Sequence, residues 1–224
     1  MLPTPIHRDL EALCTTHPEP AQLLAAVHAA TPKEIEAIAR LWLTEGIPAA
    51  FKNTPIHYEH MRHHVAEELE IHARSISIVG SARLGYSLKP IKFGRLFNPD
   101  SDLDLFIVDK DLFDGCIKAA ERWRDDVIAG RLVRKKIPFN HLSAVIASGY
   151  INPGWIPEKD EYQPVPRIKV AVRNAQRKLK KLGHHNKASA RIYEDWKRAF
   201  AKICFDVRDL KNTEPGALPP QADQ

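Results

Sequence analysis

Residues 76–108 place the strongest constraint on how this chain can fold. The segment begins with a short β-branched run, ISIV, that stops at Gly80-Ser81, and it ends with LDLFIV after a basic loop. Successive side chains of a strand point to opposite faces, so Asp102 and Asp104 project from one face about 7 Å apart. Two carboxylates at that spacing repel each other unless a cation lies between them. Mg²⁺ binds one or two carboxylates together with substrate phosphates, so the segment predicts a metal and phosphate site.

The Gly80-Ser81 turn strengthens the phosphate interpretation. Glycine permits a tight turn and a close approach of phosphate to backbone N–H groups, and Ser81 adds a hydroxyl donor. The loop that follows carries Arg83, Lys89 and Lys92, whose charges can neutralise a triphosphate. We therefore expect these five residues to bind nucleotide. The P-loop and Rossmann glycine patterns are both missing from the chain.

Length and composition set wider bounds. At 224 residues the chain can form one domain or two small ones, with an ordinary share of apolar residues. It has no apolar run as long as a membrane span and no signal-peptide core at its start. The three cysteines, Cys14, Cys116 and Cys204, are far apart, which argues against a disulfide framework or a zinc site. We expect a cytoplasmic protein that does not associate with membranes.

Helix signals surround the central segment. Thr31, Pro32 and Glu34 form a helix start with a capping box, and Gly46 is placed to end that helix. The sequence predicts an α+β fold, with a small mixed sheet flanked by helices and a C-terminal helical hairpin. The predicted parts are an N-terminal helical segment (1–54), the core (55–150) with a candidate third strand at 131–139, a Pro-rich linker (151–166), the hairpin (167–212) and a disordered tail (213–224).

The positive charge is concentrated near the C-terminus. Residues 167–211 hold 14 Lys and Arg against four acids, in a chain of net charge +5. Such a segment favours contact with a polyanion such as RNA, although a solvated basic helix face is an equally good interpretation. A second dense pattern is the group of histidines at 57–72. His60 and His64 have the spacing of a metal pair, but no acid or cysteine completes a recognisable site, so exposed helix-face histidines are favoured.

The order of these features resembles the nucleotidyltransferase superfamily of the DNA polymerase β type. That pattern is a strand, a Gly-Ser turn and a second strand with Asp-x-Asp, here Gly80-Ser81 and Asp102-Leu103-Asp104. The resemblance implies in-line attack on the α-phosphate of an NTP, with pyrophosphate leaving. Asp102 and Asp104 would hold Mg²⁺ or Mn²⁺, and Gly80 and Ser81 would hold the outer phosphates. Stand-alone bacterial members modify RNA, including tRNA, proteins or small molecules, or act in phage defence and toxin systems.

The sequence departs from that family in two respects. Twenty residues separate Ser81 from Asp102, and no Asp or Glu lies between Val127 and Ile156, where a third catalytic carboxylate is expected. Three explanations stay open: a carboxylate arrives from elsewhere, one metal suffices, or the site binds nucleotide without turnover. An enzyme is therefore the leading hypothesis, and a catalytically degenerate nucleotide-binding or scaffold module is the alternative. The candidate carboxylates from elsewhere are Asp109, Glu158, Asp160 and Asp206.

Overall fold

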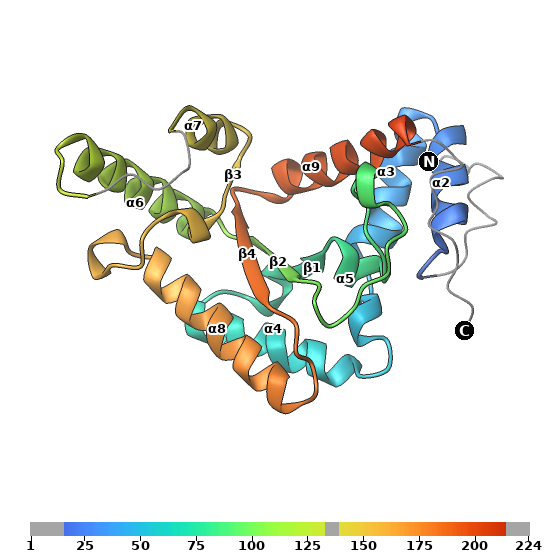
Figure 1. The fold of residues 1–224 in the computed structure, drawn as a ribbon, viewed down its shortest axis with the longest axis horizontal. Helices are drawn as coiled ribbons and strands as arrows, with labels where there is room; N and C mark the ends of the chain where they lie inside the picture. Colours follow the sequence, from blue (N-terminus) through green and yellow to red (C-terminus); the bar gives the residue numbers. More distant parts are fainter. Residues whose placement is uncertain (1–15, 133–138, 214–224) are drawn as a thin grey trace, which may run out of the picture.

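The computed structural model describes residues 16–132 and 139–213, and it has an α+β fold with helices on both faces of a mixed sheet (Figure 1). The expected fold class is confirmed. Within the described residues the α-helices are α2 (Pro20–Ala29), α3 (Pro32–Ile38), α4 (Pro55–Leu69), α5 (Ser81–Leu84), α6 (Lys110–Ile128), α7 (Phe139–Ala147), α8 (Val165–Lys181) and α9 (Trp196–Asp209). The strands are β1 (Ile76–Val79), β2 (Leu103–Val108), β3 (Tyr150–Ile151) and β4 (Ala188–Tyr193).

The sheet has the strand order β1-β2-β4-β3. β2 pairs antiparallel with β1 and parallel with β4, and β3 pairs antiparallel with β4. In this register Asp104 lies opposite Val79 on one side and opposite Ser189 on the other. The strand that carries Asp104 is therefore central, and β4 is its second neighbour.

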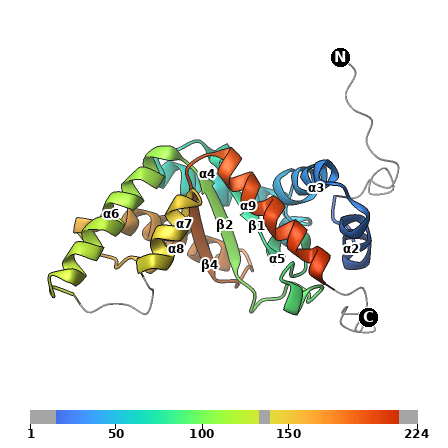
Figure 2. The ribbon, with the colours of Figure 1, turned by 90° about the horizontal axis from the view of Figure 1, so that it is seen from above.

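Each face of the sheet packs against a different group of helices. One core contains Ile78, Leu105 and Ile192 together with buried residues of α4, α6 and α8. The other contains Phe106 and Tyr193 together with buried residues of α2, α3 and α9. Figure 1 shows α4 and α8 side by side on one side of the sheet, and Figure 2 shows α9 running from the sheet towards the N-terminal helices. Successive apolar side chains of β2 therefore point alternately into the two cores.

The predicted helix start at Thr31 is present. The backbone N–H of Glu34 donates to Oγ1 of Thr31, and the N–H of Thr31 donates to Oε2 of Glu34 at 2.7 Å. The helix continues into a π-helical turn, Ala39–Thr44, and Gly46 follows with φ +77°. Pro55 begins α4 as expected.

The predicted C-terminal helical hairpin is wrong. Both of its helices exist, but β4 lies between them, and α8 and α9 pack on opposite faces of the sheet. Ile192, which has helical spacing with Trp196 and Phe200, belongs to β4 and not to a helix.

The segment expected to be a linker is also part of the core, because Ile151, Ile156 and Tyr162 are fully buried. Most of the candidate third strand at 131–139 lies outside the described residues, and Phe139 begins α7. The predicted tail falls outside them beyond Thr213. Among the described helices, none is long and apolar enough to cross a membrane.

Candidate functional site

The glycine turn lies against the Asp104 carboxylate. Val79 pairs with Asp104, so the chain turns at Gly80 directly beside that side chain. Gly80 has φ +71° and ψ −149°, a conformation that residues with a Cβ atom rarely adopt. A Cβ atom at Gly80 would lie 3.4 Å from Oδ2 of Asp104. Glycine therefore permits both the turn and the close approach, and the turn and the carboxylate are neighbours as the sequence predicts.

The two aspartates face the same cavity. Asp102 is exposed and lies immediately before β2, and Asp104 within β2 is half-buried. Oδ1 of Asp104 accepts a hydrogen bond of 2.8 Å from Oγ of Ser189. Neither carboxylate forms an ion pair with any residue that the structure describes. Both are therefore available to a cation.

The cavity has a volume of about 430 Å³, which is within the usual range for small-molecule sites. Its walls are the sheet, the loop after α5, and α9. The sheet and its edge contribute Gly80, Ser81, Asp102, Asp104, Arg191 and Tyr193; the loop contributes Ser87, Lys89, Lys92, Arg95, Asn98 and Asp100; and α9 contributes Lys202, Asp206 and Asp209.

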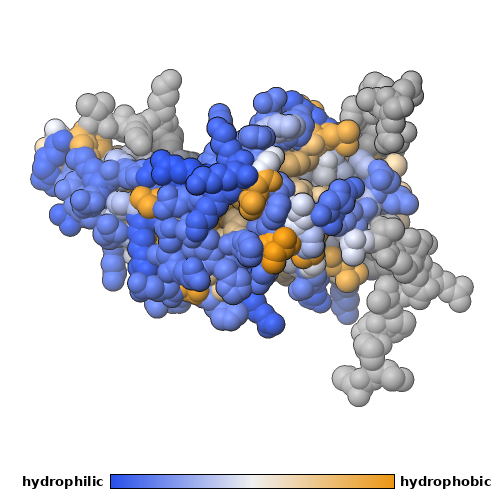
Figure 3. Space-filling model, turned by 90° about the horizontal axis from the view of Figure 1, so that it is seen from below, coloured by the Kyte–Doolittle hydropathy of each residue, from blue (hydrophilic) through white to orange (hydrophobic). Residues whose placement is uncertain are grey.

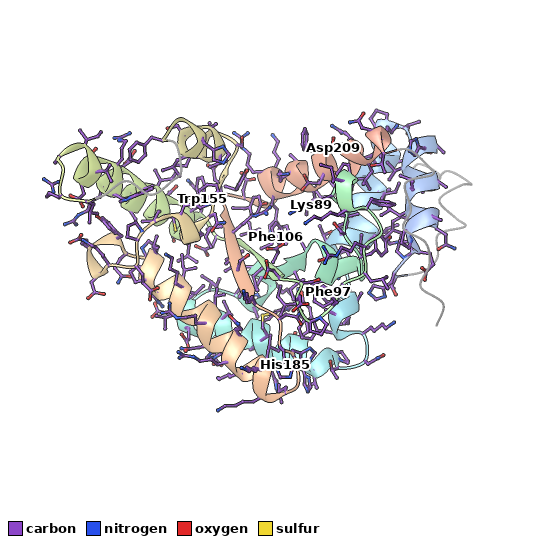
Figure 4. The ribbon with its side chains drawn as sticks, in the orientation of Figure 1. Lys89, Phe97, Phe106, Trp155, His185 and Asp209 are labelled. Carbon is purple, nitrogen blue, oxygen red and sulfur yellow. The ribbon has the colours of Figure 1, made fainter. Side chains whose placement is uncertain are left out.

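The loop that carries Lys89 and Lys92 is folded back on itself. A β-bridge joins Tyr86 to Leu96, and the N–H of Ser87 donates to the carbonyl of Arg95 at 2.9 Å. Figure 4 shows Lys89 and Asp209 on the α9 side of the molecule, whereas His185 lies on the far side beside α8. The fold of this loop places both lysines at the cavity, whereas the nucleotide binding expected of them stays a prediction.

Arg83 does not take part in the cavity, and its predicted role in nucleotide binding is wrong. Its side chain is 1% exposed. Nε donates to the carbonyl of Trp42 at 2.8 Å, and a terminal nitrogen donates to the carbonyl of Gly46 at 2.7 Å. Burial lowers the pKa of Arg83. Arg83 thus connects the segment 76–108 to the end of the N-terminal helical region through two hydrogen bonds.

The sequence interpretation missed the contribution of β4. Ser189, Arg191 and Tyr193 alternate with Ala190 and Ile192, and this period of two was the available signal. Arg191 lies opposite Phe106 on β2, so it shares the face of Asp104. Burial by itself lowers the pKa of Arg191, but Tyr193, Asp104 and Asp206 act the other way and raise it overall.

The strand next to Asp104 carries no acid. On the cavity side, β4 presents Ser189 and Arg191. Asp109 caps α6, since its Oδ1 accepts from the N–H of Leu112 at 2.9 Å. Of the acids considered as substitutes, Asp206 alone lines the cavity, and it pairs with Lys202 on α9.

The other two candidate acids lie elsewhere. Glu158 pairs with Arg173 of α8, and Asp160 lies in the short helical turn Asp160–Tyr162, on the α6 side of the sheet. Neither is among the residues that line the cavity. The described cavity therefore has one carboxylate on β2, one immediately before it, and further acids only on α9 and in the loop.

Asp102 and Asp104 suit a hard divalent cation. Both carboxylates line one cavity without an ion pair to a described residue. Mg²⁺ commonly uses one or two carboxylates and takes its remaining ligands from water and phosphate. No cluster of three or more His, Cys, Asp or Glu residues with metal-binding geometry occurs in residues 16–132 and 139–213. The donor set therefore fits a metal that arrives with a phosphate ligand better than a metal held by protein alone.

The histidines of α4 lie in a separate cavity between α4 and α8. Nδ1 of His64 lies 2.9 Å from Nζ of Lys178, and His64 also contacts Glu68, so its side chain already has partners within the protein. Nδ1 of His57 lies 3.1 Å from Nε2 of His184. Burial and the neighbouring His57 and His185 lower the pKa of His184.

Part of the basic charge on α8 is already paired within the protein. Arg167 pairs with Glu70, and Arg173 pairs with Glu158. Lys180 and Lys181 at the end of the helix are exposed, as is Arg177. The face seen in Figure 3 is largely hydrophilic, with hydrophobic residues in separate small patches.

Comparison of the chain with protein-family models, with curated proteins and with solved structures finds no match. The geometry of the cavity is therefore the basis for its interpretation.

Proposed function

We propose that the protein is a metal-dependent nucleotidyltransferase that moves an NMP from an NTP to an acceptor. The observation that carries the proposal is the arrangement around Asp104. The Gly80-Ser81 turn lies beside that carboxylate, Asp102 opens onto the same cavity, and Lys89 and Lys92 line it. A phosphate-binding turn, hard metal ligands and cations thus surround one space.

Each residue has a role that follows from its chemistry. Asp102 and Asp104 hold Mg²⁺ or Mn²⁺, which supplies charge neutralisation and polarisation of the α-phosphate. The hydroxyl of Ser81 and the N–H groups of the turn donate to the outer phosphates. Lys89 and Lys92 offset the charge that develops on the leaving pyrophosphate.

The charge balance of the cavity supports a requirement for a metal ion. Among its described lining residues, Lys89, Lys92, Arg95, Arg191 and Lys202 balance five aspartates, at positions 100, 102, 104, 206 and 209. The protein alone therefore offers no net positive charge to a triphosphate. A divalent cation at Asp102 and Asp104 shifts that balance in favour of the nucleotide.

The acceptor is an RNA (tRNA included), a protein or a small molecule. The exposed cations Arg177, Lys180 and Lys181 on α8 support a nucleic acid acceptor, because the phosphate backbone favours Lys and Arg. Transfer of radiolabel from each of the four NTPs, with Mg²⁺ and total RNA or cell protein, tests the proposal. Label should enter one acceptor fraction or a nucleotide product.

The matched variants are Asp102→Ala, Asp104→Ala and Asp125→Ala. The first two should abolish incorporation, while the third removes an exposed aspartate of α6 outside the cavity and should leave it unchanged. Absence of label from every fraction, or full incorporation by Asp102→Ala, would contradict the enzymatic proposal.

A nucleotide-binding module without turnover is the second candidate. The observation in its favour is β4, which presents Ser189 and Arg191 rather than an acid beside Asp104. Calorimetric titration with a nonhydrolysable NTP, with and without Mg²⁺, separates the two candidates. The same titration of Asp104→Asn tests whether binding needs the charge of Asp104. Tight NTP binding without Mg²⁺ and without that charge favours the binding module.

A further inference from the structure

An arginine lies on the strand next to the two aspartates. Ser189 of β4 pairs with Asp104, and Arg191 pairs with Phe106. Because side chains alternate along a strand, Arg191 projects from the same sheet face as Asp104 and Ser189. It is half-buried and lines the cavity.

The guanidinium of Arg191 has donors to spare. Its neighbour Tyr193 raises its pKa, and Arg191 forms no ion pair within the residues that the structure describes. Asp104 and Asp206 influence it electrostatically from beyond ion-pair distance. A guanidinium carries five N–H donors in a planar fork and keeps its charge at all ordinary pH values. Most of those donors therefore remain available to an anion in the cavity.

The position of this charge disfavours a second metal ion. A second divalent cation next to Asp104 needs a further anionic ligand, and the cavity side of β4 offers a serine, an arginine and a tyrosine instead. Such a cation would also be repelled by the fixed charge of Arg191. Asp206 on α9 is paired with Lys202.

Resting on the proposed function, we propose that Arg191 binds the nucleotide phosphates in the place of a second metal ion. The site then takes one divalent cation per nucleotide. Arginine suits this role because its fork makes paired hydrogen bonds to phosphate oxygens. Lys89 and Lys92 line the same cavity from the loop, so the phosphates lie between cations from two walls.

The first test compares Arg191→Ala, Arg191→Lys and the control Arg122→Ala, an exposed arginine of α6 outside the cavity. Calorimetry with a nonhydrolysable NTP and Mg²⁺ should show a loss of affinity of at least about tenfold for Arg191→Ala, as expected for a charged hydrogen bond. Arg191→Lys should recover part of that loss, and the control should bind like wild type. Urea unfolding confirms that each variant is folded.

The second test counts metal ions. Electron paramagnetic resonance of Mn²⁺ titrated into the wild-type protein with the same NTP analogue should give one tightly bound ion per chain. Two ions of similar affinity would overturn the proposal.

The two proposals fail differently. If wild-type protein binds no NTP in the presence of Mg²⁺, the proposed function falls and the role of Arg191 falls with it. If wild-type protein binds NTP and folded Arg191→Ala binds it equally well, only the role of Arg191 is overturned.

Discussion

The hydroxyl of Ser189 donates a hydrogen bond of 2.8 Å to Oδ1 of Asp104 and so links two adjacent parallel strands at the cavity. The bond fixes one oxygen of the carboxylate, while Oδ2 is the oxygen nearest to Gly80. Ser189 is therefore a positioning residue for the proposed metal ligand rather than a ligand itself.

Replacing Ser189 with alanine tests this link. In the presence of Mg²⁺, the dissociation constant of a nonhydrolysable NTP should rise about three- to tenfold. The reason is that a hydrogen bond to a charged group contributes about 1.5–3 kcal/mol when it is buried and less when it is half-buried. The free energy of unfolding should change by about 1 kcal/mol or less. Calorimetry and urea unfolding measure the two effects. The control is Ser143→Ala, an exposed serine of α7 whose hydroxyl donates to its own helix; equal effects at both positions would contradict the role of Ser189.

Gly80 offers a second test, because its backbone conformation and its surroundings can be separated. Gly80→Ala should lower the free energy of unfolding by about 1–3 kcal/mol, the usual cost of an unfavourable φ/ψ region. It should also weaken NTP binding, because it adds a methyl group to the turn that is proposed to bind phosphate, in van der Waals contact with Oδ2 of Asp104 at 3.4 Å.

Gly130→Ala is the matched control for that variant. Gly130 has φ +70°, and a Cβ atom there would meet nothing within 4 Å. Its replacement should destabilise the protein through the backbone alone and leave NTP affinity unchanged. Calorimetry at a temperature where both variants are folded makes the comparison, and unchanged NTP affinity in Gly80→Ala would refute a role of the turn in binding.

The sequence was sufficient for the local features of this site. The Gly80-Ser81 turn, the alternation around Asp104 and the capping box at Thr31 each depend on residues close together in the chain, whose spacing follows from strand and helix geometry. Lys89 and Lys92 line the cavity because their loop begins and ends at the two strands, and their binding of nucleotide stays a prediction.

The features that the sequence did not reveal depend on long-range contacts. Ser189 of β4 lies 85 residues after its partner Asp104 in the sequence. The six residues of β4 lie between two basic helical segments. Ile192 fits the apolar spacing of the helix that follows, so the helical pattern was extended too far. The contact of Arg83 with Trp42 spans 41 residues, and nothing local distinguishes a buried arginine from a phosphate-binding one.

Arg83 leads to a third prediction, in which stability and binding separate. Arg83→Met removes two hydrogen bonds and leaves the carbonyls of Trp42 and Gly46 without that donor, so the free energy of unfolding should fall by about 2–4 kcal/mol. Below the unfolding transition, affinity for NTP should stay close to that of wild type, because Arg83 does not line the cavity. Urea unfolding and calorimetry test the two parts. A stable variant that has lost NTP binding would restore the role that the sequence suggested.

The pKa of His184 provides a prediction about pH. Burial and the neighbouring histidines lower this pKa below the ordinary value of 6.5, so the neutral imidazole is favoured in the folded state. As pH falls through about 6.5 towards the lowered pKa, the unfolded chain binds the proton first, and the free energy of unfolding decreases. Above about pH 6.5, where His184 is neutral in both states, its protonation therefore no longer lowers the free energy of unfolding. Urea unfolding at about pH 7.5 and about pH 5.5 should show a smaller decrease for His184→Gln than for wild type. An equal or larger decrease in the variant would show that proton uptake at His184 is not coupled to unfolding.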